Sequence, residues 1–242
     1  MGKFEDALKD VFKNNGAMTP TSRVCLLGAD GTPSGSDTIE RVSSIMFTKE
    51  DLVDMGLPSG TLWCKRNLGA LKETDNGYYF SWGNLNGHSK GSGYNFSDAT
   101  YSDSPAASIA ASLTVSQDAA RANLGKAWRM PSKEEFAELC NSEYVDFIDG
   151  SGNVISGTDK STTYNGVVGL RIKSKANGNI LFLPAAGFYS GTTLHNEGSS
   201  GYYWSSSFST ATHAYGLSFG SGGVIPQDDY SRRYGFSVRP VI

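Results

Sequence analysis

Residues that commonly carry chemistry are few in this sequence and lie far apart. The three histidines, His88, His195 and His213, have no spacing that would place them together on one helix or loop as metal ligands. The sequence contains no phosphate-binding glycine loop, no G-x-S-x-G elbow and no H-E-x-x-H metal helix. We therefore predict no catalytic residues, no metal site and no cofactor.

The cysteines and one acidic loop have structural interpretations. Cys25, Cys64 and Cys140 are odd in number and widely separated, so buried reduced thiols are expected rather than a disulfide framework or a zinc site. The segment Asp149–Asn153 has some residues of a calcium loop but lacks its sixth-position glycine and twelfth-position glutamate. We predict a hairpin tip there.

Charge and hydropathy exclude two classes of partner. The net charge is −3 and the basic residues are scattered, so we predict no nucleic-acid binding. No segment approaches the roughly 20 apolar residues that span a bilayer, so we predict no membrane insertion. The first residues also lack the apolar stretch of a secretory signal, which indicates a protein kept in a cytoplasm or a trimmed N-terminus.

Two short helices are predicted near the middle of the chain. Ser116 can cap a helix over residues 117–124. Ser132 and Glu135 form a capping-box pattern before a helix over residues 133–140. The carboxylates in the first turns of that second helix favour its macrodipole, so they are expected to be structural.

Strands are predicted from residue 167 onward. Val168, Leu170 and Ile172 alternate with period two, and Asn177-Gly178 forms a turn before a returning strand. Together with the helices and the glycine-rich loops, this pattern predicts an α+β domain with an antiparallel sheet over residues 47–242.

The first 46 residues are predicted to form a separate attachment or oligomerisation segment. Phe4, Leu8 and Val11 lie on one helical stripe that is too short to be stable alone. Residues 21–45 resemble modules at the assembly end of phage tail-fibre and tail-tip proteins. That resemblance implies contact with other virion proteins and a homotrimer packed around the stripe.

Five stretches of the main domain resemble a known family. They are VDMGLPSGTLWCKRNLGA (53–70), LGKAWRMPSKEEFAEL (124–139), ILFLPAAGFYSG (180–191), GYYWSS (201–206) and YGFSVRPV (234–241). In this order they resemble the FISUMP-type major paralogous domain of gut anaerobes, a branch of the C-type-lectin-like superfamily. On physical grounds Trp63 and Trp128 in the first two stretches are expected to be core anchors.

The resemblance implies binding rather than catalysis. The enzyme branch of the superfamily uses paired cysteines near the C-terminal end, and none follows Cys140 here. The calcium-dependent sugar-binding branch has a W-N-D motif, whereas Trp204 is followed by two serines. The sequence is more similar to the variable proteins of diversity-generating retroelements, whose variable region ends as residues 235–241 do. Mutagenesis in that branch cannot create Lys, Met, Trp, Gln or Glu. After residue 186 there is no Lys or Met, and only Trp204, Glu197 and Gln227 come from that set.

The C-terminal quarter is predicted to be the recognition surface. Tyr215, Leu217 and Phe219 share one face of a strand and should be core, while the small Gly216 and Ser218 on the other face should leave room for a ligand. Tyr-rich surroundings are typical of antibody-like recognition. The predicted ligand-binding residues are Tyr189, Thr192, His195, Tyr202, Phe208, Thr210, His213, Gly216, Ser218, Asp228, Asp229, Tyr230, Arg233 and Tyr234.

These features lead to two alternatives for function. One is a receptor-binding component of a phage virion, made in a bacterial cytoplasm, that contacts a protein or glycan on a bacterial surface. The other is an adhesin or lipoprotein module of the same fold on the bacterial cell surface. Asp228 and Asp229 beside Arg233 predict a surface of mixed charge in either case.

Overall fold

The computed structural model describes residues 47–98 and 113–242. The chain divides into two compact units, Met1–Asp51 and Leu52–Ile242. The predicted attachment segment, with its Phe4, Leu8 and Val11 stripe, lies outside the described residues, as does Cys25.

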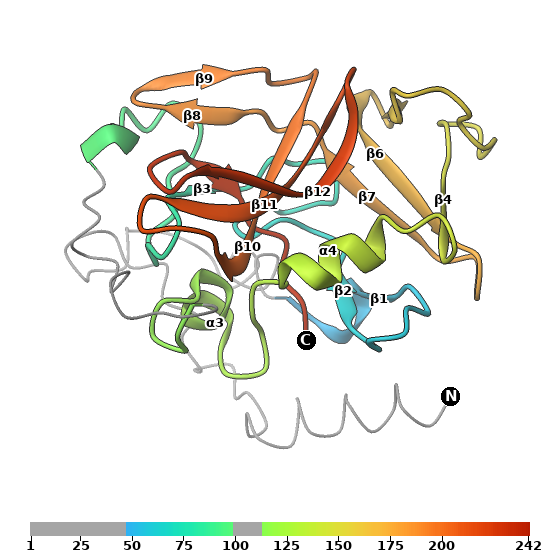
Figure 1. Cartoon of the computed structure of the whole chain (residues 1–242), viewed down its shortest axis with the longest axis horizontal. Coiled ribbons are helices and arrows are strands. Elements are labelled where there is room, and N and C mark those ends of the chain that lie inside the picture. Colours follow the sequence, from blue (N-terminus) through green and yellow to red (C-terminus); the bar gives the residue numbers. More distant parts are fainter. Residues whose placement is uncertain (1–46, 99–112) are drawn as a thin grey trace. The chain divides into compact units, whose positions relative to one another are not determined.

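A five-stranded sheet lies at the centre of this unit (Figure 1). Its order is β12-β11-β10-β13-β3, and every pairing is antiparallel except that of β10 with β13. The strands are β3 (Tyr79–Phe80), β10 (Gly201–Phe208), β11 (His213–Gly220), β12 (Gly223–Ser231) and β13 (Phe236–Ser237).

Three smaller sheets surround it. A four-stranded antiparallel sheet places β6 beside β4, β5 and β7, and the β6–β7 pair is the hairpin predicted around Asn177-Gly178. The strands are β1 (Leu52–Asp54), β2 (Leu62–Cys64), β4 (Val145–Phe147), β5 (Ser161–Tyr164), β6 (Val167–Ser174), β7 (Ile180–Pro184), β8 (Phe188–Ser190) and β9 (Thr193–His195). The pairs β1–β2 and β8–β9 form two-stranded sheets.

The described residues contain two α-helices, close to the predicted positions. The first, α3 (Ala119–Leu124), begins two residues later than predicted. Its N-cap is Asp118 and not Ser116, because the Asp118 carboxylate accepts from Arg121 N and also from Met130 N. The second, α4 (Lys133–Leu139), has the predicted capping box. Two short 3-10 turns, η1 (Lys49–Asp51) and η2 (Phe96–Asp98), complete the elements.

The main core lies between α4 and one face of the central sheet. Phe136 of α4 packs in one buried cluster with Leu217 and Phe219 of β11 and with Trp63 of β2, whose ring centroid is 5.5 Å from that of Phe136. Both residues of β11 were predicted to be core, as was Trp63. Tyr215 on the same face remains partly exposed, with the Lys133 ammonium 4.2 Å from its ring centroid.

Segments far apart in the sequence are joined by the residues that follow β13. Leu62 exchanges two backbone hydrogen bonds with Ile242, and Arg129 exchanges two with Val241. The buried Arg239 guanidinium donates to Cys64 O at 2.9 Å and to Phe182 O at 3.0 Å. Residues 238–242 therefore close the domain against its first strands.

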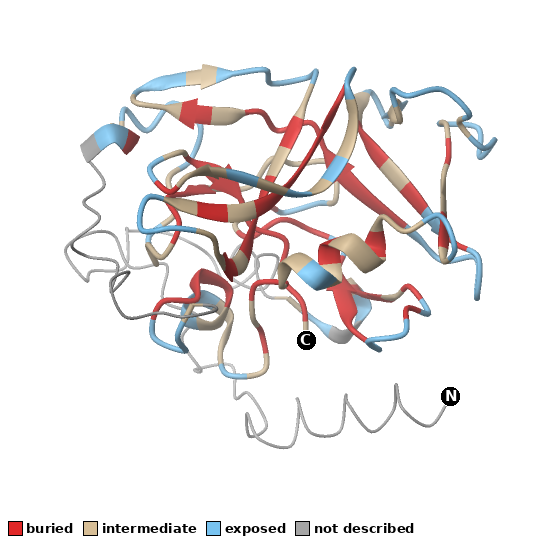
Figure 2. Cartoon of the chain, viewed as in Figure 1, coloured by how far each residue is buried: buried red, intermediate tan, exposed pale blue. Residues whose placement is uncertain are grey.

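The structure confirms a mixed α+β class with short helices and antiparallel sheets. Figure 2 shows the buried residues along β2, β7 and β10, and exposed residues along β9 and the loops. Cys64 is a buried free thiol, as predicted, whereas Cys140 is free but only partly buried. The Asp149 carboxylate accepts from Ser151 N and Asn153 N, which makes this segment the predicted hairpin tip.

Candidate functional site

An aromatic cluster covers the face of the central sheet opposite α4. We call it the aromatic surface, and it consists of Phe188, His195, Tyr202, Tyr230 and Tyr234. Neighbouring ring centroids are 4.8 Å apart for Phe188 and Tyr202, and 5.6 Å apart for Tyr202 and Tyr230. His195 is exposed and the other four are partly exposed, so these rings are both packed on one another and open to solvent.

Two buried rings support the aromatic surface from below. Phe236 of β13 is fully buried and stacks on the fully buried Trp204 at 4.2 Å with an interplanar angle of 21°. Tyr234 lies nearly parallel to Phe236, at 6.1 Å and 22°, whereas Tyr230 meets it edge-on at 5.0 Å and 71°. Each such pair is worth about 0.5–1.5 kcal/mol beyond its buried area, so the rings hold one another in place.

A polar rim borders the aromatic surface at β12. The Asp228 carboxylate accepts from the hydroxyl of Tyr230, from the hydroxyl of Ser218 at 3.4 Å and from Asp229 N at 3.0 Å. Burial, together with the hydrogen bond to Asp228, raises the pKa of Tyr230 well above its ordinary value. The Tyr230 hydroxyl therefore stays protonated and keeps the Asp228 carboxylate fixed as an acceptor.

The β8–β9 hairpin brings Phe188 and His195 to this surface. At Gly187 the backbone has φ +66°, and a Cβ there would lie 2.2 Å from His195 O and 2.6 Å from Glu197 N. This position before β8 thus requires glycine for both conformation and space. Tyr189, the next residue after Phe188, exchanges two backbone hydrogen bonds with Gly235 and so ties the hairpin to the residues before β13.

Three predicted site residues are buried instead of open to a ligand. Tyr189 points into a second core cluster, where it stacks on Phe96 at 5.2 Å. Gly216 leaves no room for a ligand, because a Cβ there would lie 2.7 Å from Tyr203 O and 3.7 Å from the Trp204 ring. Ser218 is 7% exposed, and its hydroxyl donates a hydrogen bond to the Asp228 carboxylate. The predictions for Tyr189 and Gly216 were therefore wrong, while Tyr203 and Trp204 are core as expected.

Other predicted residues lie near the β10–β11 turn. The Asp229 carboxylate accepts from Ser209 at 3.0 Å, and the His213 ring contacts the Thr212 hydroxyl at 2.9 Å. Asp229 follows Asp228 on one strand, so its side chain points to the opposite face of the sheet, away from the aromatic surface. Phe208 packs on Trp82 at 6.4 Å.

The structure thus divides the predicted set. His195, Tyr202, Asp228, Tyr230 and Tyr234 come together, with Ser218 beneath. Phe208, Thr210, His213 and Asp229 lie at or near the β10–β11 turn. Arg233 is exposed beyond β12, and Thr192 is exposed at the β8–β9 turn.

Phe188 is not among the ligand-binding residues predicted from the sequence. Period-two alternation allows only one of Phe188 and Tyr189 to face outward, and the sequence pattern gave no sign of which one.

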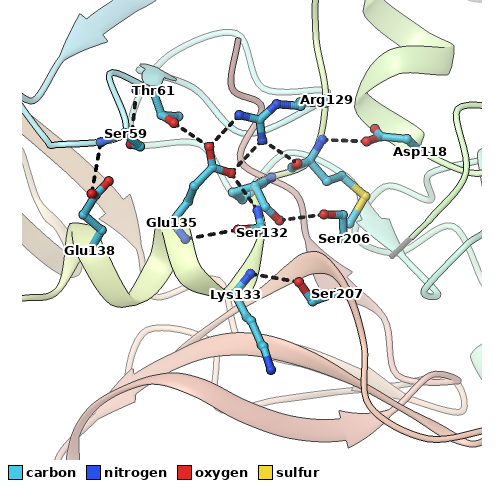
Figure 3. A network of polar contacts seen from close by, with 12 residues as sticks. Ser59, Thr61, Asp118, Arg129, Ser132, Lys133, Glu135, Glu138, Ser206 and Ser207 are labelled. Carbon is cyan, nitrogen blue, oxygen red and sulfur yellow. Dashed lines mark hydrogen bonds and ion pairs between the residues drawn. The ribbon is translucent and has the colours of Figure 1, made fainter. Parts of the chain in front are cut away.

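A polar network centred on Glu135 gives a structural role to polar residues of the stretch 124–139 (Figure 3). The Glu135 carboxylate accepts from both terminal nitrogens of Arg129, from the Thr61 hydroxyl and from Ser132 N at 2.8 Å. Burial alone would raise the pKa of Glu135, but the hydrogen bonds from Arg129 and Thr61 hold it below its ordinary value. With four donors on its two oxygens, this carboxylate serves the fold by joining α4 to the Thr61 and Arg129 segments.

Comparison with known proteins gives one match. A family described as Domain of unknown function (DUF8237) matches residues 171–241, which include every predicted ligand-binding residue and the whole aromatic surface. Neither a curated protein nor a solved structure matches the chain. Within residues 47–98 and 113–242, no cluster of three His, Cys, Asp or Glu side chains could hold a metal ion, and no helix is long and apolar enough to cross a membrane.

Proposed function

We propose that this protein is a ligand-binding protein whose recognition site is the aromatic surface, displayed on a C-type-lectin-like scaffold. The observation that carries the proposal is the group of partly exposed aromatic rings above the buried Phe236. Aromatic side chains that remain open to solvent as a group usually mark an interaction site. Tyr contributes contact area at low entropic cost because it has only two side-chain torsions.

The scaffold assignment has support from both sequence and fold. The five family-like stretches lie in β1–β2, at α4, in β7–β8, in β10 and in residues 234–241. Three features of the described residues agree with a C-type-lectin-like domain. They are two short helices, antiparallel sheets, and the pairing of residues 238–242 with β2. The lack of Lys and Met after residue 186, where only Trp204, Glu197 and Gln227 come from the set that this mutagenesis cannot create, supports a diversified C-terminal surface.

The biological setting that we propose is the tip of a phage tail, where the aromatic surface contacts a receptor on a bacterium. The alternative setting is a bacterial surface adhesin of the same fold. A reverse-transcriptase gene and a near-copy of the C-terminal coding region beside this gene would support the phage setting. An export signal or lipoprotein cysteine upstream would support the adhesin.

Cell binding by matched variants tests the proposed site. We would measure binding of the fluorescently labelled protein to a panel of gut-bacterial cells, and repeat it with Tyr202→Ala/Tyr234→Ala. The control is Thr210→Ala/Asp229→Ala, which removes side chains near the β10–β11 turn. We expect the first variant to lose at least about tenfold in affinity and the control to change by less than about twofold, because a few central aromatic residues dominate most interfaces.

Folding of both variants would be checked by circular dichroism and thermal unfolding. Equal binding by the wild type and the Tyr202→Ala/Tyr234→Ala variant, with both folded, would rule out the aromatic surface as the site. A loss confined to the control variant would move the site to the β10–β11 turn.

A further inference from the structure

We infer that the aromatic surface binds an uncharged glycan, with a sugar ring stacked on an aromatic ring and its hydroxyl groups bound at the Asp228 rim. This inference rests on the proposed function and specifies the chemical class of the ligand. Sequence alone left a protein and a glycan as equal alternatives. The arrangement of the rings and of the polar atoms beside them favours the glycan.

The rings present a platform and not a pocket. Neighbouring rings of the aromatic surface contact one another at centroid distances of 4.8–5.6 Å, so no ligand side chain fits between them. Tyr234 lies nearly parallel to the buried Phe236, and His195 lies at 27° to Phe188. His195 is exposed and Tyr234 is partly exposed, so part of each ring is open to a ligand. A ligand must therefore lie on top of these rings, as the C–H face of a pyranose does on an aromatic ring.

The polar groups at the rim complement sugar hydroxyls. Asp228 accepts three hydrogen bonds from the protein, and a carboxylate has about four acceptor positions, so one remains for a ligand hydroxyl. The Tyr202 hydroxyl accepts from Asn196 Nδ2 at 3.3 Å, which leaves its own proton to donate. A sugar hydroxyl is both donor and acceptor, so hydroxyls of a sugar can donate to Asp228 and accept from Tyr202. Asp228 is held rigidly by its protein donors, which lowers the entropic cost of binding.

The negative charge at the rim disfavours an anionic ligand. Asp228 places a negative charge at the rim, and it would repel a sialylated, sulfated or phosphorylated sugar. The other carboxylate near β9, Glu197, is paired with Lys90 at 2.6 Å. A charge-assisted hydrogen bond from a neutral hydroxyl to Asp228 has no such repulsion and is stronger than a bond between neutral groups.

Two measurements test the ligand class. The first is a glycan array that carries neutral and anionic bacterial glycans, probed with the wild type, Tyr234→Ala, Asp228→Asn and the control Asp229→Asn. Asp228→Asn retains the shape of the side chain but removes its charge, and Asp229 lies on the opposite face of the same strand. We expect neutral glycans to bind, Tyr234→Ala and Asp228→Asn each to weaken binding at least about tenfold, and Asp229→Asn to change it less than about twofold. Binding restricted to anionic glycans, or equal binding by Asp228→Asn, would overturn the inference.

The second measurement is binding to bacterial cells treated with periodate, which cleaves sugar diols, or with protease. We expect binding to be lost after periodate treatment and to survive protease treatment. Binding that survives periodate, is lost after protease and still requires Tyr202 and Tyr234 would show a protein receptor. The glycan inference would then be wrong while the proposed function stands. Cell binding that is indifferent to Tyr202 and Tyr234 would instead refute the proposed function.

Discussion

Replacement of Glu135 by Gln should destabilise the domain by about 2–3 kcal/mol. The change keeps the size of the side chain but removes the charge that pairs with Arg129 and one of the oxygens that accept from Arg129, Thr61 and Ser132. Loss of a partner from a fully buried ion pair costs roughly 3–5 kcal/mol, and an exposed pair is worth about 0–1 kcal/mol. The Glu135 side chain is 12% exposed and that of Arg129 is 34% exposed, so solvent screens part of the interaction and the cost falls between these limits.

Glu134→Gln is the matched control on the same helix. Both substitutions remove one negative charge from the first turn of α4, where it favours the helix dipole by about 0.3–1 kcal/mol. The Glu134 side chain is 67% exposed, and its salt bridge to Lys133 is long at 3.9 Å. The difference between the two variants therefore isolates the network around Arg129. Urea unfolding followed by tryptophan fluorescence at neutral pH would measure both free energies.

The pH dependence gives an independent test of the same network. The folded-state pKa of Glu135 lies below its ordinary value of 4.5, so the carboxylate contributes stability above about pH 4.5. That contribution is lost as the pH falls through the depressed folded-state pKa, because Glu135 is then protonated in both states. The stability difference between wild type and Glu135→Gln should shrink over this range. Equal losses for Glu134→Gln and Glu135→Gln, or a difference that does not change with pH, would refute the role given to Glu135.

Three further outcomes are expected from buried or constrained groups. Arg239→Met should lower the free energy of unfolding by about 2–4 kcal/mol in the same urea assay, because two buried carbonyl oxygens lose their donor. Gly187→Ala should weaken cell binding and lower the melting temperature more than Gly198→Ala does; both glycines have positive φ, but only Gly187 lies against neighbouring backbone. Burial raises the pKa of Cys140 to about 12, so peptide mass spectrometry should show slow alkylation of Cys140 at mildly alkaline pH in the folded protein and fast alkylation in urea. Similar losses for the two glycine variants, or fast alkylation of folded Cys140, would contradict these accounts.

Local signals in the sequence predicted the second helix and one hairpin well. The capping box at Ser132 and Glu135 and the hairpin of β6 and β7 depend on neighbouring residues, and both are present. The N-cap of α3 was missed because it depends on a tertiary contact. Asp118 binds Met130 N as well as its own helix, so it prevails over Ser116, which had only local spacing in its favour.

The candidate site was less predictable than the elements. Composition indicated that the C-terminal quarter forms the recognition surface. It could not show which face of each strand is buried against the core and which is open to solvent. Tyr189 and Phe188 differ only in register, and that register is fixed by hydrogen bonds between Tyr189 and Gly235, far along the chain. Asp228 and Asp229 were predicted to act together, yet successive residues on β12 point to opposite faces. Sheet register depends on the whole fold, so the sequence pattern could not show which residues lie on the aromatic surface and which lie on the opposite face.

The pairing of residues 238–242 with β2 also determines when this domain can fold during synthesis. Arg239 binds Cys64 O across 175 residues of chain, and Leu62 pairs with Ile242. Every strand of the central sheet must therefore be synthesised before β2 can pair with residues 238–242. Until then, the backbone groups of Leu62 and Cys64 that bind these residues have no partner there. Contacts of such long sequence separation slow folding and prolong exposure of aggregation-prone strands. Folding of this domain can consequently be completed only after residues 238–242 have left the ribosome, and it should benefit from chaperones that shield unpaired strands.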